Sequence, residues 1–99
     1  MRQSHLDEYF SFLRFPSVST DASYSDKVSQ CADWVAQKLK AIGLEAEVVP
    51  TAGHPIVWGR NKHREGRRTV VIYGHYDVQP PDPLELWDSP PFEPVLKDG

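Results

Sequence analysis

One continuous apolar run, residues 70–73 (Val-Val-Ile-Tyr), constrains the fold of this chain more than any other stretch. The run is β-branched and aromatic and lacks polar alternation, which is typical of a strand covered on both faces inside an α/β sheet. It ends at Gly74, and His75-Tyr76-Asp77 follow directly. Because side chains alternate along an extended chain, His75 and Asp77 are predicted to project to the same side. Open α/β sheets carry their chemistry just beyond the carboxyl ends of such strands.

The spacing of His75 and Asp77 has two interpretations. An imidazole with a carboxylate two residues further on suits a metal ligand and the partner that orients it. The alternative is a pair of hydrogen-bonded residues at the start of a loop, because H-x-D is a short and common pattern. The triplet alone leaves both interpretations open.

Composition narrows the class of protein. The 99 residues, 39% apolar and 25% charged, are typical of an ordinary soluble globular chain with one small core, below the usual size of an α/β enzyme domain. A formal net charge of −3 argues against nucleic acid and against an anionic membrane surface as partners. The basic cluster at residues 60–68 is interrupted by Glu65 and Gly66 and is interpreted as a solvated turn.

The cellular setting is predicted from what the sequence contains and lacks. Cys31 is the only cysteine, so an intramolecular disulfide is excluded, and a free thiol fits a reducing compartment. No apolar run approaches the roughly 20 residues of a membrane helix, and the first residues lack the apolar core of a secretory signal. The predicted location is the cytoplasm. The motifs of dinucleotide-binding, P-loop, serine-hydrolase and thioredoxin-type proteins are absent.

Two helices are predicted first. One begins at an N-cap at Ser4 and ends before Pro16. The other begins at a capping pattern in residues 23–26 and is closed by Gly43, which supplies a left-handed residue. Cys31 lies on the apolar stripe of the second helix, so it is interpreted as a core residue rather than a nucleophile.

Strands are predicted at residues 44–49, 56–58 and 69–74. The order helix, helix, strand, strand, strand indicates an α/β or α+β fold, with the third strand the most buried. His54 lies in the turn between the first two strands and is interpreted as structural or solvated, whereas His5 and His63 are interpreted as solvated.

A proline-rich loop follows Asp77. The prolines of residues 78–83 exclude a central strand or a helix interior. Leu84, Leu86 and Trp87 are predicted to dock this loop onto the body, and residues 92–96 are predicted to form a short strand. The loop is interpreted as the wall of a site, and the alternative is a polyproline ligand for an SH3-like partner.

Three stretches together resemble a known family. Residues 71–80 (Val-Ile-Tyr-Gly-His-Tyr-Asp-Val-Gln-Pro) and 87–94 (Trp-Asp-Ser-Pro-Pro-Phe-Glu-Pro) resemble the co-catalytic zinc peptidases that include carnosine-type dipeptidases, aminoacylase and carboxypeptidase G. Residues 15–19 (Phe-Pro-Ser-Val-Ser) resemble the first loop of that family. The inserted residues 80–87 resemble its dipeptidase branch in particular.

The resemblance implies roles for the two candidate residues. His75 would be a ligand of one Zn²⁺ in a two-zinc site, and Asp77 would be the catalytic-site carboxylate that accepts a hydrogen bond from its other ring nitrogen. Residues 1–99 would form the N-terminal portion of the catalytic domain, with two helices followed by strands of a mixed sheet. The bridging Asp, the Glu-Glu pair and the later ligands of the family have no counterpart here. Carboxylates such as Asp82, Glu85 and Asp88 receive no metal role from the resemblance.

The predicted function follows from this resemblance. The complete protein would be a zinc-dependent dipeptidase or related amide hydrolase that acts on small peptides or N-acyl amino acids and forms a homodimer. The isolated chain is predicted to be inactive and, because residues 70–73 need covering layers, to expose apolar surface. The alternative is a non-enzymatic remnant or a module that interacts through its proline loop.

Overall fold

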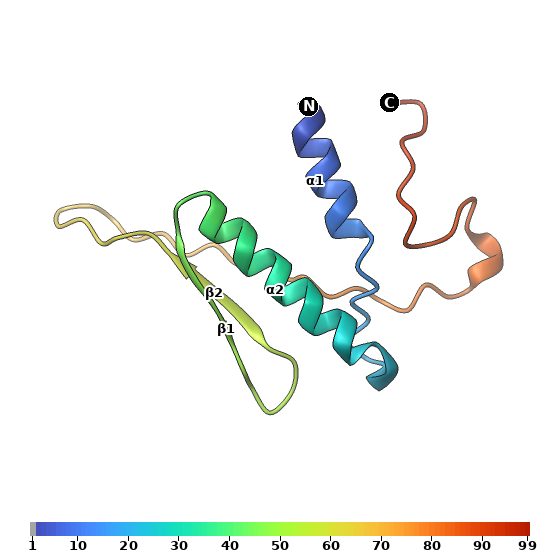
Figure 1. Ribbon diagram of the computed structural model, residues 1–99, viewed down its shortest axis with the longest axis horizontal. Helices are drawn as coiled ribbons and strands as arrows, with labels where there is room; N and C mark the ends of the chain where they lie inside the picture. Colours follow the sequence, from blue (N-terminus) through green and yellow to red (C-terminus); the bar gives the residue numbers. More distant parts are fainter. Residues whose placement is uncertain (1) are drawn as a thin grey trace.

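The chain, described over residues 2–99 in a computed structural model, consists of two helices, a β-hairpin and a long final segment (Figure 1). Helices α1 and α2 cover Gln3–Leu13 and Ser25–Ala41, and strands β1 and β2 cover Glu45–Val49 and Ile56–Arg60. Two 3-10 turns, η1 (Ala22–Tyr24) and η2 (Leu84–Leu86), complete the elements. The predicted α/β class, with two helices that precede the strands, is confirmed.

Helix α2 has well-defined signals at its C-terminal end, whereas its N-cap residue, Tyr24, makes no side-chain capping bond. Just before α2, the Asp21 carboxylate accepts a hydrogen bond from the Ser23 backbone at 2.9 Å and so caps the 3-10 turn η1. Lys38 and Lys40 lie in the last turn, where positive charge suits the helix dipole. Gly43 follows with φ of +91°, as predicted for a left-handed closing residue.

The β-hairpin packs against α2. Strands β1 and β2 are antiparallel, with Glu45 opposite Arg60 and Val49 opposite Ile56. A Cβ added at Gly59 would lie 2.9 Å from Leu39 Cδ1, so the absence of a side chain lets strand and helix approach closely.

The core is small and centred on α2. Its fully or nearly fully buried apolar residues share one face of that helix, joined by one valine from the loop that follows α1. They are Val18, Val28, Cys31, Ala32 and Ala36. The prediction that Cys31 is a core residue is confirmed, since its exposure is 0%.

Helix α1 attaches to α2 through aromatic rings. Phe12 stacks on Trp34 with ring centroids 5.6 Å apart, and Phe15 lies 6.0 Å from the same indole. Lys38 bridges the helices, because its ammonium pairs with Glu8 at 2.8 Å and lies 5.2 Å from the Trp34 ring. The helix begins at Gln3 rather than after the predicted cap Ser4.

The prediction that residues 69–74 form a covered strand is wrong for this chain. Val70, Val71, Ile72 and Tyr73 are 79%, 81%, 91% and 87% exposed. Within residues 2–99, β1 and β2 pair only with each other, and none of the recorded backbone hydrogen bonds involves residues 69–74. A strand forms only where a neighbouring chain completes its hydrogen bonds, and no described segment does so here.

Two further expectations for the final segment are also wrong. Leu84, Leu86 and Trp87 do not dock onto the body, since they are 59%, 76% and 51% exposed. Residues 92–96 form no strand. Figure 1 shows this segment crossing beside α2 and then extending away from the hairpin. Along residues 2–99, no helix has the length and apolar character that a membrane crossing requires.

Candidate metal-ligand site

The loop after α1 lies alongside the residues that follow the apolar run. Val18 and Val78 form a parallel β-bridge, and the Val78 backbone donates a hydrogen bond to the Ser17 carbonyl at 3.0 Å. Ser17 and Val18 are each only 1% exposed. This bridge fixes the direction of residues 75–78 relative to the helical body.

Tyr76 is held at both ends. Its backbone carbonyl accepts a hydrogen bond from Ser17 Oγ at 2.7 Å and lies 3.7 Å from Cys31 Sγ. Its hydroxyl donates to the Pro55 carbonyl in the hairpin turn. Burial raises the pKa of the Cys31 thiol and that of the Tyr76 hydroxyl, so both groups stay protonated as donors at neutral pH. The segment is thus tied to a loop, to α2 and to the hairpin.

His75 and Asp77 are in contact. His75 Nδ1 lies 3.0 Å from Asp77 Oδ1 and 3.0 Å from the Asp77 carbonyl oxygen. Both partners are acceptors, so Nδ1 carries the proton, and in the neutral ring Nε2 keeps a free lone pair. The side chains of His75 and Asp77 are 70% and 44% exposed, which leaves the ring open to a ligand. The predicted contact is present, while the metal role remains a prediction.

Ser19 completes the shell of Asp77. Its hydroxyl donates to Asp77 Oδ2 at 2.6 Å. This bond is the main reason that the pKa of the Asp77 carboxyl is lowered, and His75 lowers the pKa further. Asp77 is therefore a carboxylate at neutral pH, with one oxygen turned to His75 and the other to Ser19.

His54 reaches the same place from the hairpin turn. Its Nε2 lies 2.7 Å from the Ser19 carbonyl oxygen, and a carbonyl only accepts, so Nε2 carries the proton. The structural interpretation of His54 therefore holds, although its partner is 35 residues away. The turn itself is shaped by Thr51, whose hydroxyl donates to the His54 carbonyl at 2.7 Å.

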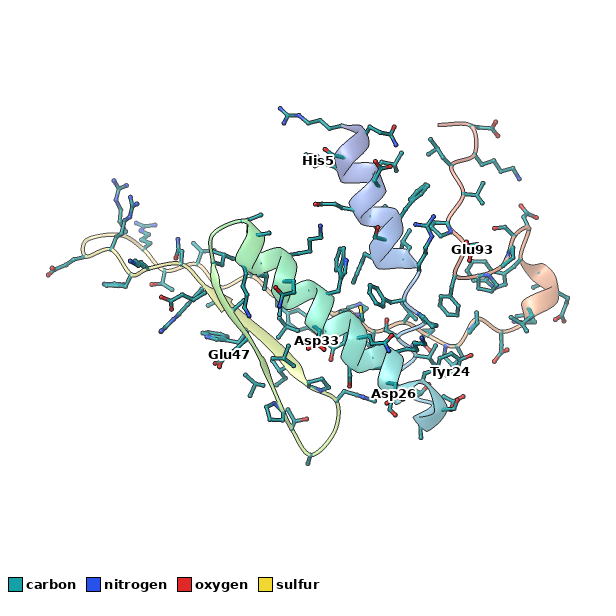
Figure 2. All side chains as sticks on the ribbon, in the orientation of Figure 1. His5, Tyr24, Asp26, Asp33, Glu47 and Glu93 are labelled. Carbon is teal, nitrogen blue, oxygen red and sulfur yellow. The ribbon has the colours of Figure 1, made fainter. Side chains whose placement is uncertain are left out.

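The donor set fits a metal ion at one coordination position. An imidazole with a free Nε2 and an acidic partner on Nδ1 is the usual arrangement of a zinc-ligating histidine. Across the described part of the chain, however, no group of three or more His, Cys, Asp or Glu side chains converges. Figure 2 shows Asp26, Asp33, Glu47 and Glu93 at separate positions on α2, β1 and the final segment. Residues 2–99 thus hold one predicted ligand, His75, with the residues that support it, and no converging group of three or more.

The site is open to solvent, because the side chains of His75 and Asp77 are 70% and 44% exposed. A hollow of about 310 Å³ lies between α1 and α2 and is lined by Tyr9, Phe12, Trp34 and Val35 together with the polar side chains of His5 and Glu8. It includes neither His75 nor Asp77.

Sequence reasoning missed four residues of this arrangement. Ser17, Ser19, His54 and Tyr76 contribute contacts across 21 to 59 residues of chain. One signal was available for the serines, because residues 15–19 resemble the family's first loop and place a hydroxyl on each side of Val18. Nothing in the local sequence singles out His54.

Sequence comparison identifies relatives among curated proteins, although no protein-family model matches the chain. Succinyl-diaminopimelate desuccinylases from Burkholderia ambifaria and Burkholderia cenocepacia are each 35% identical over 80 residues. The alignments cover 79% of this chain and 21% of each relative. The chain therefore spans about a fifth of the length of the curated relatives it matches.

Two solved structures share the fold. The M20 family metallo-carboxypeptidase Sso-CP2 from Sulfolobus solfataricus matches with a TM-score of 0.83 and 30% identity, over 99% of this chain and 22% of that one. The di-peptidase Dug1p from Saccharomyces cerevisiae matches with a TM-score of 0.79 and 28% identity, over 95% of this chain and 23% of that one. Sequence and fold agree with the resemblance seen in residues 15–19, 71–80 and 87–94: the chain is similar to metallopeptidases of the M20 family in both respects.

Proposed function

We propose that residues 1–99 are the N-terminal portion of a zinc-dependent dipeptidase or related amide hydrolase, to which they contribute His75 as a metal ligand and Asp77 as its orienting carboxylate. The observation that carries this proposal is the pairing of His75 Nδ1 with Asp77 Oδ1 at 3.0 Å, which leaves Nε2 free on a 70% exposed side chain. That pair lies in a segment whose relatives are metallopeptidases by fold and by sequence.

Each residue would have one role in the proposed chemistry. Two bound zinc ions would supply a water of lowered pKa and polarise the scissile carbonyl. Asp77 keeps the proton of His75 on Nδ1 and so keeps Nε2 available as a ligand. The Asp77 charge also increases the basicity of the ring, which favours binding to a cation.

The substrate class is proposed from the relatives. Their names describe a desuccinylase, a carboxypeptidase and a di-peptidase, and each of these activities is hydrolysis of an amide bond. Small peptides and N-acyl amino acids are therefore the substrates to test. The complete enzyme is proposed to act as a homodimer in the cytoplasm, where the free, buried Cys31 would stay reduced.

The isolated chain is proposed to be inactive. A catalytic zinc needs about three protein ligands and an open position for water. Among the described residues, no group of three or more His, Cys, Asp or Glu side chains could hold a metal ion. The exposed run at residues 70–73 supports the same view, because an unbroken β-branched segment is suited to a strand that further strands and helices cover.

The test is metal-dependent hydrolysis by two proteins. The chain alone and the chain extended through its reading frame beyond Gly99 would each be given zinc, a panel of dipeptides and a panel of N-acyl amino acids. We expect hydrolysis only from the extended protein, lost on chelation and restored by zinc. His75→Ala should abolish it, since the loss of a ligand weakens metal binding at the reacting centre.

Two controls make the result specific. His63→Ala changes an exposed histidine outside the contacts of the site and should leave hydrolysis unchanged. Asp77→Asn keeps the size of the side chain but removes its charge, and should reduce activity by about 10- to 100-fold. Full activity of the extended protein with His75→Ala, or hydrolysis by the purified 99-residue chain, would contradict the proposal.

A further inference from the structure

We infer that Ser19 is a positioning residue of this site: its hydroxyl holds the Asp77 carboxylate in the orientation that directs His75. The inference deepens the proposed function and rests on it for the meaning of the site, although the contacts stand by themselves. Ser19 has no metal-binding chemistry of its own in this arrangement, and it acts only through Asp77.

The two oxygens of Asp77 have different partners. Oδ1 accepts from His75 Nδ1 at 3.0 Å, and Oδ2 accepts from Ser19 Oγ at 2.6 Å. A carboxylate held at one oxygen can rotate about its Cβ–Cγ bond and exchange its oxygens. A carboxylate held at both oxygens cannot do so without losing a hydrogen bond. Ser19 therefore fixes the plane of the Asp77 carboxylate relative to the His75 ring.

Ser19 is itself held in place. The neighbouring Val18 is 1% exposed and bridges to Val78, and the Ser19 carbonyl accepts from His54 Nε2 at 2.7 Å. The hydroxyl is thus presented by backbone that two other parts of the fold restrain. Supporting residues that are restrained in this way are what a site needs for exact orientation of a ligand.

The consequence is measurable at His75. With Asp77 fixed, the proton of the neutral ring stays on Nδ1 and Nε2 stays free. If Ser19 no longer holds Asp77, the carboxylate becomes mobile, and the Asp77 carbonyl oxygen at 3.0 Å is the acceptor that still favours the proton on Nδ1. The alternative tautomer, protonated on Nε2, therefore gains population. That tautomer has no lone pair on Nε2 to offer a metal ion.

The experiment measures the tautomer of His75 in the ¹⁵N-labelled chain of residues 1–99, without metal, at one pH well above the ordinary histidine pKa of about 6.5. Ring nitrogen shifts give the ratio of the Nδ1-protonated to the Nε2-protonated form. We expect the Nδ1 form to dominate in the wild-type chain. Ser19→Ala should lower the ratio about three- to tenfold, the change that corresponds to one partly exposed hydrogen bond.

Ser17→Ala is the matched control. Ser17 lies in the same loop, but its hydroxyl donates to the Tyr76 carbonyl at 2.7 Å and not to Asp77. This variant should lower the stability of the chain and leave the His75 ratio unchanged. Ser19→Thr keeps the hydroxyl and should restore the wild-type ratio.

Three results would overturn the inference. The first is a His75 tautomer ratio in folded Ser19→Ala that equals the wild-type ratio. The second is a change of the ratio in Ser17→Ala as large as that in Ser19→Ala, which would indicate general loosening of the loop. If Ser19→Ala does not fold, the wild-type chain decides through the three-bond couplings about the Ser19 χ1 angle. A single rotamer supports the inference, and averaging over rotamers overturns it.

This readout is independent of hydrolysis. A tautomer ratio that responds to Ser19→Ala while the extended protein fails to hydrolyse any amide would refute the proposed function and leave the positioning role intact. Zinc-dependent hydrolysis that His75→Ala abolishes, with a tautomer ratio indifferent to Ser19, would do the reverse.

Discussion

Paired valine-to-alanine substitutions test whether the apolar run at residues 70–73 lies outside the folded core. Val28 on α2 is 0% exposed, whereas Val70 is 79% exposed. Each substitution removes the same two carbons. The comparison therefore measures burial, with the chemistry of the change held constant.

The expected difference follows from the structure. At roughly 0.8 kcal/mol per buried carbon, Val28→Ala loses about 1.6 kcal/mol, and the cavity left in the core raises the loss to about 2–3 kcal/mol. The better helix propensity of alanine returns about 0.5 kcal/mol, which leaves a loss of about 2 kcal/mol in the free energy of unfolding. At Val70 only about a fifth of the side chain is removed from water, so the loss is about 0.3 kcal/mol.

The assay is urea unfolding followed by far-ultraviolet circular dichroism, at two protein concentrations. Val28→Ala should shift the midpoint strongly to lower urea, and Val70→Ala should leave it almost unchanged at both concentrations. A loss at Val70 similar to that at Val28 would refute the reasoning, because it would place the run inside a packed core.

Three smaller predictions concern titration, reactivity and backbone conformation. The pKa of the Asp77 carboxyl should lie below its usual value of 3.8, because Ser19 and His75 bind its charged form. The carboxylate then contributes stability above pH 3.8, and this contribution disappears as the pH falls through the lowered pKa. Ser19→Ala should raise the pKa of Asp77, measured by ¹³C NMR. Cys31 should react with a thiol reagent far more slowly in the native chain than in urea, because burial raises its pKa and blocks access. Gly43→Ala should destabilise the chain by about 1 kcal/mol in the same urea-unfolding assay, because φ is +91° there and the strain is the whole cost, with no atom near enough to clash; Gly74→Ala should be close to neutral.

The helices and the hairpin are predictable from sequence because their signals are local. The apolar stripe of α2, the lysines of its last turn and Gly43 all lie within the element they define. The two strands of the hairpin are likewise separated by a short turn marked by proline and glycine. The periodicity of apolar residues and the positions of glycine and proline are sufficient to predict such elements.

Residues 70–73 show the limit of the same reasoning. Their β-branched composition correctly describes a segment suited to burial, but a composition does not supply the neighbours that bury it. In residues 2–99 the two hairpin strands pair only with each other, and α2 packs against the hairpin and, through Trp34, against α1. The run therefore stays exposed, although its composition is typical of a strand covered on both faces.

The candidate site likewise combines local contacts, which sequence can predict, with long-range contacts, which it cannot. His75 and Asp77 are two residues apart, so their contact could be predicted from strand geometry. Ser19 and His54 are brought in by contacts that span 58 and 35 residues, and no periodicity encodes such pairs. The local half of the site could be predicted from sequence, and the half made by tertiary contacts could not.

The β-bridge between Val18 and Val78 has a consequence for the order of folding. Helix and hairpin contacts close short loops, whereas the Ser17–Tyr76 and Ser19–Asp77 bonds close loops of 59 and 58 residues, which costs more chain entropy before any contact compensates. Substitutions of Ser17 or Ser19 that remove these hydrogen bonds should therefore act mainly on the unfolding rate and little on the folding rate. A newly synthesised chain would form α2 and its hairpin first, and residues 75–78 would reach their place beside Ser17 and Ser19 only at the last step of folding.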